Sequence, residues 1–209
     1  MMGKSVKLNE QSCNAESRPY RMLRRAELVE DTRQRIVEAA VKLHTTVGPA
    51  RTTISALAEE AGVTRVTVYR HFADDDELFH ACRSHWLSLH PPPDPLRWQE
   101  VPAVEDRVRQ ALQERYAWYR QNHDALFLLR RDLASMPQFV QEANRAAEQE
   151  AVGALLHGVR ARGRARRRLY AAAGHVLSFW TWRSLALDQG LLDSEAVELA
   201  TRFITSASP

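Results

Sequence analysis

Apolar residues at helical spacing recur along almost the whole chain, and this periodicity is the strongest constraint on its fold. The segment DTRQRIVEAAVKLHTTVG is predicted to be a helix, with Asp31 as its N-cap and Gln34 three residues later. Its apolar residues form a stripe on one face, which we expect to be buried. The stripe consists of Ile36, Val37, Ala40, Leu43 and Val47. No segment alternates Val, Ile or Thr with polar residues between hairpin turns. The sequence therefore predicts an all-α protein.

The predicted helices fall into two domains joined by a stiff proline-rich connector, HPPPDPLRWQEVP. Residues 29–89 form the smaller domain, and residues 94–209 form a larger helical domain. Residues 1–28 lack helical periodicity and are expected to be a mobile basic arm. The helices of the larger domain are expected near 103–121, 124–134, 138–160, 166–188 and 194–206.

The excess of positive charge lies in the N-terminal third of the chain. The 209 residues carry a formal net charge of +3, yet residues 1–72 hold 12 Lys and Arg against 8 Asp and Glu, a net of +4. A basic front favours a polyanionic partner, although a surplus of this size is weak support by itself. The later run RARGRARRR at residues 160–168 is interpreted as a solvated face rather than a second nucleic-acid site.

Several protein classes are disfavoured by the composition. No segment approaches the roughly 18 apolar residues of a membrane span, and the polar N-terminus has no signal-peptide centre, so we expect a cytoplasmic protein. Cys13 and Cys82 fit neither a disulfide framework nor a zinc pattern and are expected to be free thiols. His80, His85 and His90 recur every five residues, which turns them away from one another on a helix. No metal site and no cofactor are expected.

The segment AGVTRVTVYRHF, residues 61–72, predicts the second helix of a helix-turn-helix. A preceding helix of about two turns begins after Thr52 or Thr53 and ends at Gly62. Thr64 is the expected N-cap of the second helix, with Val68 and Phe72 facing inward. Its outward residues can bond phosphate oxygens or base edges in the major groove of DNA. Alone, two short helices around a glycine are a weak signal.

The wider segments TRQRIVEAAVKLHTTVG and TTISALAEEAGVTRVTVYRHFADDDELF are far more specific. Over about residues 29–86 they resemble the N-terminal domain of the TetR family of bacterial transcriptional regulators. The resemblance implies a homodimer with a three-helix DNA-binding domain and a larger helical domain that binds a small-molecule effector. It also implies repression of a pseudo-palindromic operator in double-stranded DNA, released when the effector binds.

Two positions depart from the family pattern. Val66 stands where the family often has Gly, and it can contact a thymine methyl group or change how closely the helix approaches DNA. Asp75 stands where the family often has Lys, which removes an expected phosphate contact. Binding could thus be weaker or depend more on the N-terminal arm. The residues expected to bind DNA are Thr52, Thr53, Thr64, Arg65, Val66, Thr67, Tyr69, Arg70 and His71.

The larger domain is rich in aromatic residues, which individually are more often core than ligand contacts. Together with a few polar neighbours they are typical of an effector pocket of unknown specificity. The expected ligand-binding residues are Trp98, Tyr116, Tyr119, His123, Phe127, His175, Phe179 and Trp182.

A dimer interface is expected on the last two long helices, where small and apolar residues share a stripe. This set consists of Leu169, Ala172, Ala173, Val176, Leu177, Trp180, Val197, Ala200 and Ile204.

Two other classes of function are alternatives to a transcriptional regulator. An enzyme is disfavoured because the chain has no glycine-rich phosphate loop, no serine nucleophile elbow and no paired carboxylates in a shared setting. A helical interaction protein without sequence-specific DNA binding is the alternative, and a gel-shift survey of DNA upstream of its own gene separates it from a regulator.

Overall fold

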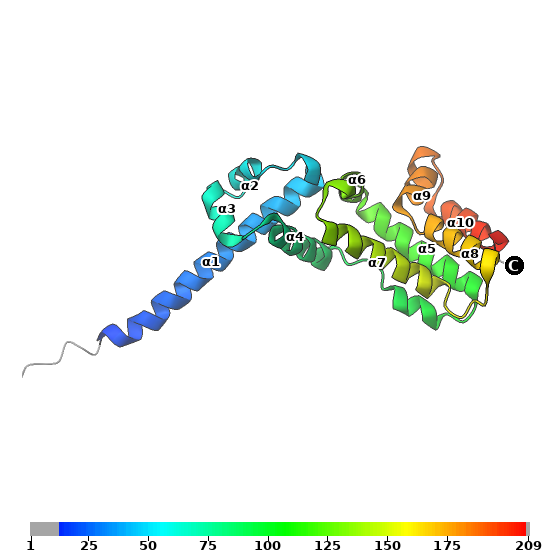
Figure 1. Cartoon of the computed structure of the whole chain (residues 1–209), viewed down its shortest axis with the longest axis horizontal. Helices are drawn as coiled ribbons and strands as arrows, with labels where there is room; N and C mark the ends of the chain where they lie inside the picture. The colour runs from blue at the N-terminus through cyan, green and yellow to red at the C-terminus, as the bar shows by residue number, and fades with distance from the viewer. Residues whose placement is uncertain (1–12, 208–209) are drawn as a thin grey trace, which may run out of the picture.

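The structure, a computed structural model, describes residues 13–207, and these form helices and connecting turns without a strand. Figure 1 shows a smaller N-terminal group of helices, α1 to α4, beside a larger group, α5 to α10. Two separate clusters of buried side chains correspond to the two groups. The all-α fold predicted from the sequence is confirmed. No helix in the described part of the chain is long and apolar enough to cross a membrane.

The N-terminal domain is built on α1 (Cys13–Thr46), which packs against α2 (Ile54–Glu60) and α4 (Asp75–Leu89). The short helix α3 (Arg65–His71) packs on α2. Between α1 and α2, Gly48 precedes a single 3-10 turn, η1 (Pro49–Arg51). The buried residues of this domain include Ile36, Val37 and Ala40, as the periodicity predicts, whereas Val47 lies beyond the helix end and is exposed.

The start of α1 corrects two expectations. Residues 13–28, expected to belong to a mobile arm, are helical in the structure, and Figure 1 shows this part of α1 projecting beyond the other helices. Asp31 is therefore inside the helix and caps nothing. The backbone hydrogen bonds of a helix form within the helix, so they need no contact with a core. Arg, Glu, Leu and Met are also good helix formers, and residues 13–28 can therefore be helical without an apolar stripe. Residues 1–12, also assigned to the arm, lie outside the described residues.

The larger domain contains α5 (Val104–Gln121), α6 (His123–Arg131), α7 (Gln138–Leu155), α8 (Gly163–Val176), α9 (Phe179–Arg183) and α10 (Asp193–Ala207). Helix α5 is central and packs against α10, α7 and α9. The expected helix over 166–188 is wrong as a continuous element: α8 ends at Val176, and the Ser178 hydroxyl caps α9 by accepting the Trp180 backbone N–H. The proline-rich connector contains a 3-10 helix, Pro95–Glu100, which buries Trp98.

The two domains meet where the C-terminal half of α1 packs against α6. The Asp132 carboxylate, at the end of α6, accepts the backbone N–H of Ala50 at 3.1 Å. Arg131 donates to the Val47 carbonyl and also to Asp132. We call these hydrogen bonds, which join Arg131 and Asp132 to the turn after α1, the junction contact. It joins the larger domain to the segment that leads into α2.

Candidate DNA-binding surface and effector cavity

The helix-turn-helix consists of α2, the turn at Gly62, and α3. Both helices begin with a threonine cap: Thr53 Oγ1 accepts the Ala56 N–H and Thr64 Oγ1 accepts the Thr67 N–H. Gly62 has a φ of +65°, a conformation that L side chains rarely adopt, and the Val63 N–H then returns to the Ala58 carbonyl. These local bonds fix the turn as the sequence predicts.

The inner face of α3 fastens the helix to the domain. Val68 and Phe72 are buried, and the Arg33 guanidinium lies 4.5 Å from the centre of the Phe72 ring. Arg33 also pairs with Glu77 at 3.2 Å, and Glu77 accepts the Ala73 N–H. That backbone hydrogen bond, followed by Arg33, lowers the pKa of Glu77. Helix α3 is thus held in place by its buried inner face and by the contacts of Arg33 in α1 and Glu77 in α4 around its C-terminal end.

The outer face of α3 presents polar side chains that the protein itself does not use. Arg65, Tyr69 and Arg70 are exposed, and among the described residues none of the three makes a side-chain hydrogen bond or ion pair. Val66 is 75% exposed, the most exposed large apolar residue of the described chain. The two unpaired arginines can contact the phosphates of DNA. The exposed Val66 side chain can contact a thymine methyl group in the major groove.

The remaining residues expected to bind DNA lie at the same surface, but several of them already make hydrogen bonds within the protein or are partly buried. Thr64 and Thr67 share a hydroxyl contact of 3.0 Å, and the Thr52 hydroxyl donates to the Gly48 carbonyl. Thr53 is exposed, and His71 is partly buried. The structure therefore brings all nine residues to one helix-turn-helix, with Thr52 and His71 at its margins.

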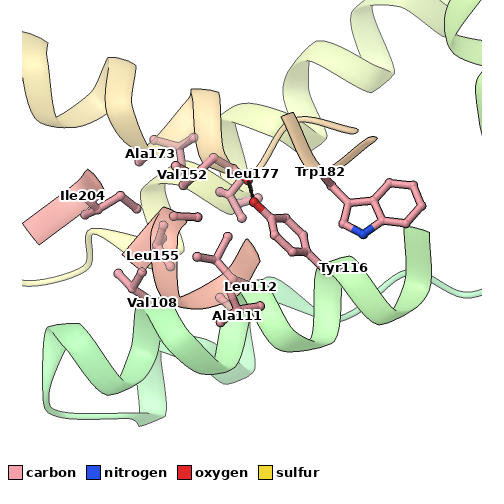
Figure 2. Close-up of a cluster of buried hydrophobic side chains, with 14 of the residues drawn as sticks. Val108, Ala111, Leu112, Tyr116, Val152, Leu155, Ala173, Leu177, Trp182 and Ile204 are labelled. Carbon is pink, nitrogen blue, oxygen red and sulfur yellow. Dashed lines mark hydrogen bonds between the residues drawn. The ribbon is translucent and has the colours of Figure 1, made fainter. Parts of the chain in front are cut away.

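The structure divides the expected ligand-binding set, most of which lies in the core of the larger domain. Trp98, Tyr116, Tyr119, Phe179 and Trp182 are buried at 2% exposure or less in the core of the larger domain. Figure 2 shows Tyr116 and Trp182 among packed apolar side chains. Their polar atoms are satisfied internally; the Tyr116 hydroxyl, for example, donates to the Val176 carbonyl at 2.8 Å. Aromatic residues with satisfied polar ends are core here.

The other three members of that set also fail to meet in one cavity. His175 is exposed, and its carbonyl accepts the Thr181 hydroxyl. Phe127 packs edge-on against Trp180. His123 borders a shallow polar hollow beside Asn122 and Asp124. No common site is formed by the predicted residues.

A partly open cavity instead lies at the junction of α1, α4, α5, α6 and α7, with a volume of about 120 Å³. Its walls are mainly apolar and aromatic, including Phe79, Trp86 and Trp118, with His44 and Arg83 among them. Burial lowers the pKa of His44 to about 4, so this imidazole is neutral at physiological pH. We call this space the junction cavity. The sequence signal for it was the position of His44, four residues after Ala40 on the buried side of α1.

A second, larger and more open groove of about 600 Å³ lies between α5, α7 and α8. Its lining is more polar and includes Arg115, Arg145 and Glu148. The Arg115 guanidinium already donates to the Tyr119 hydroxyl, and Glu148 pairs with Arg130. The junction cavity is the better enclosed of the two.

The expected dimer interface is also corrected. Eight of its nine residues, all except Trp180, are buried within the single chain at 6% exposure or less, because α8, α10 and α5 pack on one another. Residues that fill the core of one chain cannot bind a second copy. The exposed large apolar residues of this region are Tyr170, Trp180, Leu187, Leu192, Leu199 and Phe203.

Comparison with known proteins agrees with the geometry of the N-terminal domain. The family model described as bacterial regulatory proteins, tetR family, matches residues 36–82, from the middle of α1 into α4. The HTH-type transcriptional regulator SrpR of Pseudomonas putida is 41% identical over 68 residues, which are 31% of this chain and 32% of SrpR. The HTH-type transcriptional regulator TtgR, also of Pseudomonas putida, is 46% identical over 61 residues, 29% of each chain. The matches thus span about a third of each of these two relatives.

Solved structures extend the likeness of fold to both domains. NalD, described as the secondary repressor of the MexAB-OprM multidrug efflux pump in Pseudomonas aeruginosa, aligns with a TM-score of 0.56 and 22% identity over 85% of this chain and 96% of NalD. The multidrug binding protein EbrR, complexed with imidazole, aligns with a TM-score of 0.51 and 25% identity over 83% of this chain and 90% of EbrR. The helix-turn-helix domain thus matches the tetR family of bacterial regulatory proteins in sequence over residues 36–82, and the two-domain architecture is similar in fold to that of solved regulators.

Proposed function

We propose that this protein is a cytoplasmic, ligand-responsive transcriptional repressor that binds a pseudo-palindromic operator as a homodimer. The observation that carries the proposal is the outer face of α3, where Arg65, Tyr69 and Arg70 are exposed and unpaired beside a firmly capped helix start. Repression is supported by the printed description of NalD as a repressor. A non-enzymatic role is supported by the match of residues 36–82 to a family of regulatory proteins.

Within this proposal the residues of α3 divide by the kind of DNA contact. Arg65, Val66 and Thr67 occupy the first turn, the part of a recognition helix that enters the major groove, and they select bases. Tyr69 and Arg70 lie one turn later and bond phosphates, which hold the register without reading sequence. Thr53 and Thr64 add phosphate contacts at the two helix starts.

The homodimer is proposed to form through the exposed faces of α8 and α10 rather than through the residues first expected. Tyr170 on α8 and Leu199 and Phe203 on α10 are each between 38% and 50% exposed. The ring centroid of Phe203 lies 5.8 Å from that of His175, so α8 and α10 present one continuous surface. Pairing this surface through a two-fold axis places one helix-turn-helix on each half of a palindrome.

The effector is proposed to bind in the junction cavity. Its walls belong to α1 and α4 of the DNA-binding domain and to α5, α6 and α7 of the larger domain. A ligand that binds one relative arrangement of these helices better than another changes the spacing of the two recognition helices. By linkage, operator DNA must lower the affinity for such a ligand by the same factor.

The DNA-binding part is tested with Arg65→Ala and Tyr69→Phe on an operator found by gel shift upstream of the gene. We expect Arg65→Ala to weaken operator binding by about 1 to 3 kcal/mol and to relax preference at one base pair of each half-site. Tyr69→Phe should weaken operator and scrambled duplexes alike, a difference best measured at two salt concentrations. Arg97→Ala, which removes an exposed arginine of the 3-10 helix Pro95–Glu100 away from α3, α8 and α10, is the matched control.

If Arg65→Ala and Tyr69→Phe bind every duplex as the unchanged protein does, sequence-specific DNA binding by α3 is refuted. The chain would then fit the alternative of a helical interaction protein. If only Tyr69→Phe alters base preference, the orientation assigned to α3 in the groove is wrong.

A further inference from the structure

The walls of the junction cavity carry three polar side chains that the protein leaves without partners. His44 is only 7% exposed, and Arg83 and Asn144 are partly buried. Among the described residues, none of these three side chains makes a hydrogen bond or an ion pair. No buried side-chain nitrogen or oxygen of the described residues lacks a hydrogen-bond partner, so the polar atoms of these three side chains still reach solvent and are available to a polar ligand in the cavity.

The charge of the cavity wall has one sign. Two arginines, Arg83 and Arg130, line the cavity, and no Asp or Glu is among its lining residues. Glu148 neutralises Arg130 through an ion pair, so Arg83 is the cation without a counter-charge. Burial lowers the pKa of Arg83, which shows that water solvates this guanidinium incompletely. An anion beside Arg83 would restore the missing interaction, and a cation would be repelled.

The remaining wall is apolar and favours flat groups. Trp86, Trp118 and Phe79 line the space, and the His44 ring stacks on Phe79 with their centroids 4.9 Å apart. The neutral imidazole of His44 offers one donor and one acceptor at the edge of this aromatic wall. Aromatic faces of this kind stack with a ring or pack against its edge.

The volume limits the size of the ligand. Drug-sized molecules occupy pockets of roughly 300 to 1,000 Å³. The junction cavity, at about 120 Å³, is closer to an engineered cavity of roughly 150 Å³ that holds one benzene. The structure without ligand has room for about one ring and a small substituent.

We propose that the junction cavity binds a single-ring aromatic carboxylate, with the carboxylate on Arg83 and the ring between Phe79 and Trp86. His44 and Asn144 supply further hydrogen bonds to the ligand. The proposal rests on the effector site suggested above and adds the chemical class of the ligand. Neither a bulky drug nor an aromatic cation fits this combination of volume and charge.

The test uses benzoate, benzamide and benzamidine, three ligands of nearly the same shape that are negative, neutral and positive. Binding to the full-length protein is measured by calorimetry and by the fluorescence of Trp86 and Trp118, which border the cavity. We expect benzoate to bind on the order of tenfold to a hundredfold more tightly than benzamide, the usual range for a hydrogen bond to a charged group, and benzamidine to bind least. Benzamidine binding as tightly as benzoate, or no benzoate binding at millimolar concentration, overturns the proposal.

Substitution of the arginine locates the site. Arg83→Met keeps an unbranched apolar side chain but removes the guanidinium, and it should remove the preference for benzoate over benzamide, whereas Arg167→Met, at an exposed position on α8, should leave it unchanged. Preference retained in Arg83→Met contradicts the assignment even if that variant is less stable. Operator binding is measured separately: benzoate that binds without changing operator affinity supports the ligand class and refutes the effector role.

Discussion

Replacement of Asp132 should reveal how strongly the two domains depend on the junction contact. The side chain is 7% exposed and accepts hydrogen bonds from the Ala50 N–H at 3.1 Å and from Arg131 Nε at 2.6 Å. The pair with Arg131 is partly exposed, so solvent screens it and its contribution to stability is small. The bond from Ala50 reaches a buried carboxylate and is worth about 1.5 to 3 kcal/mol.

We therefore expect Asp132→Ala to lower the free energy of unfolding by about 2 kcal/mol. Asp132→Asn keeps an acceptor for Ala50 but loses the charge, and it should cost about half as much. The measurement is urea unfolding followed by circular dichroism. Asp188→Ala, which removes an exposed partner of Arg183, is the matched control and should change the free energy by less than about 1 kcal/mol.

The pH dependence gives an independent check on the charge. Arg131 first, and then the Ala50 N–H, lower the pKa of Asp132 below its ordinary value of 3.8. A carboxylate with a lowered pKa stabilises the folded state above its unfolded-state pKa and loses this effect as the pH falls through the folded-state pKa. The stability difference between the unchanged protein and Asp132→Asn should thus be constant from pH 7 to about pH 5 and shrink below about pH 4. A difference that is absent at pH 7, or an Asp132→Ala variant as stable as the control, refutes the reasoning.

Two further substitutions and one labelling experiment test the surface and the core. Phe203→Glu, on the exposed face of α10, should convert the proposed dimer to a monomer in light scattering at micromolar concentration without lowering helicity; an unchanged mass contradicts the interface. Tyr116→Phe removes the donor to the buried Val176 carbonyl and should lower the free energy of unfolding by about 1 to 3 kcal/mol, whereas an unchanged urea midpoint would show that water replaces it. Burial raises the pKa of Cys82 to about 12, so in a Cys13→Ser background a disulfide reagent at pH 8 should label Cys82 only on unfolding, and fast labelling of the folded protein contradicts this.

The sequence was most informative where local chemistry decides the structure. Thr53 and Thr64 are caps because their hydroxyls accept backbone N–H groups three residues on, and such bonds depend on neighbours in the chain alone. The inward positions of Val68 and Phe72 follow from helical spacing in the same way. The helix-turn-helix, and with it the candidate DNA-binding residues, was therefore predictable.

The sequence was least informative where packing between distant helices decides. A small-residue stripe such as Ala172, Ala173 and Val176 is suited equally to a partner helix in the same chain and to one in a second copy, and α10 and α5 take that place first. Aromatic residues of the larger domain, such as Tyr116, carry no mark that separates core from pocket. The junction cavity combines residues from five helices, and only the burial of His44 could have been suspected from spacing.

The length of α1 has a mechanical consequence. The helix is continuous from Cys13 to Thr46, and the junction contact joins the larger domain just beyond its C-terminal end. From Thr46 to Tyr20 the helix is about 40 Å long at 1.5 Å per residue. A tilt of only about 5° at the junction therefore moves the end near Tyr20 by about 3 Å, comparable with the spacing of adjacent base pairs. Because α1 is long, a rotation of a few degrees where it meets α6 would be converted into a displacement of several ångströms at its far end.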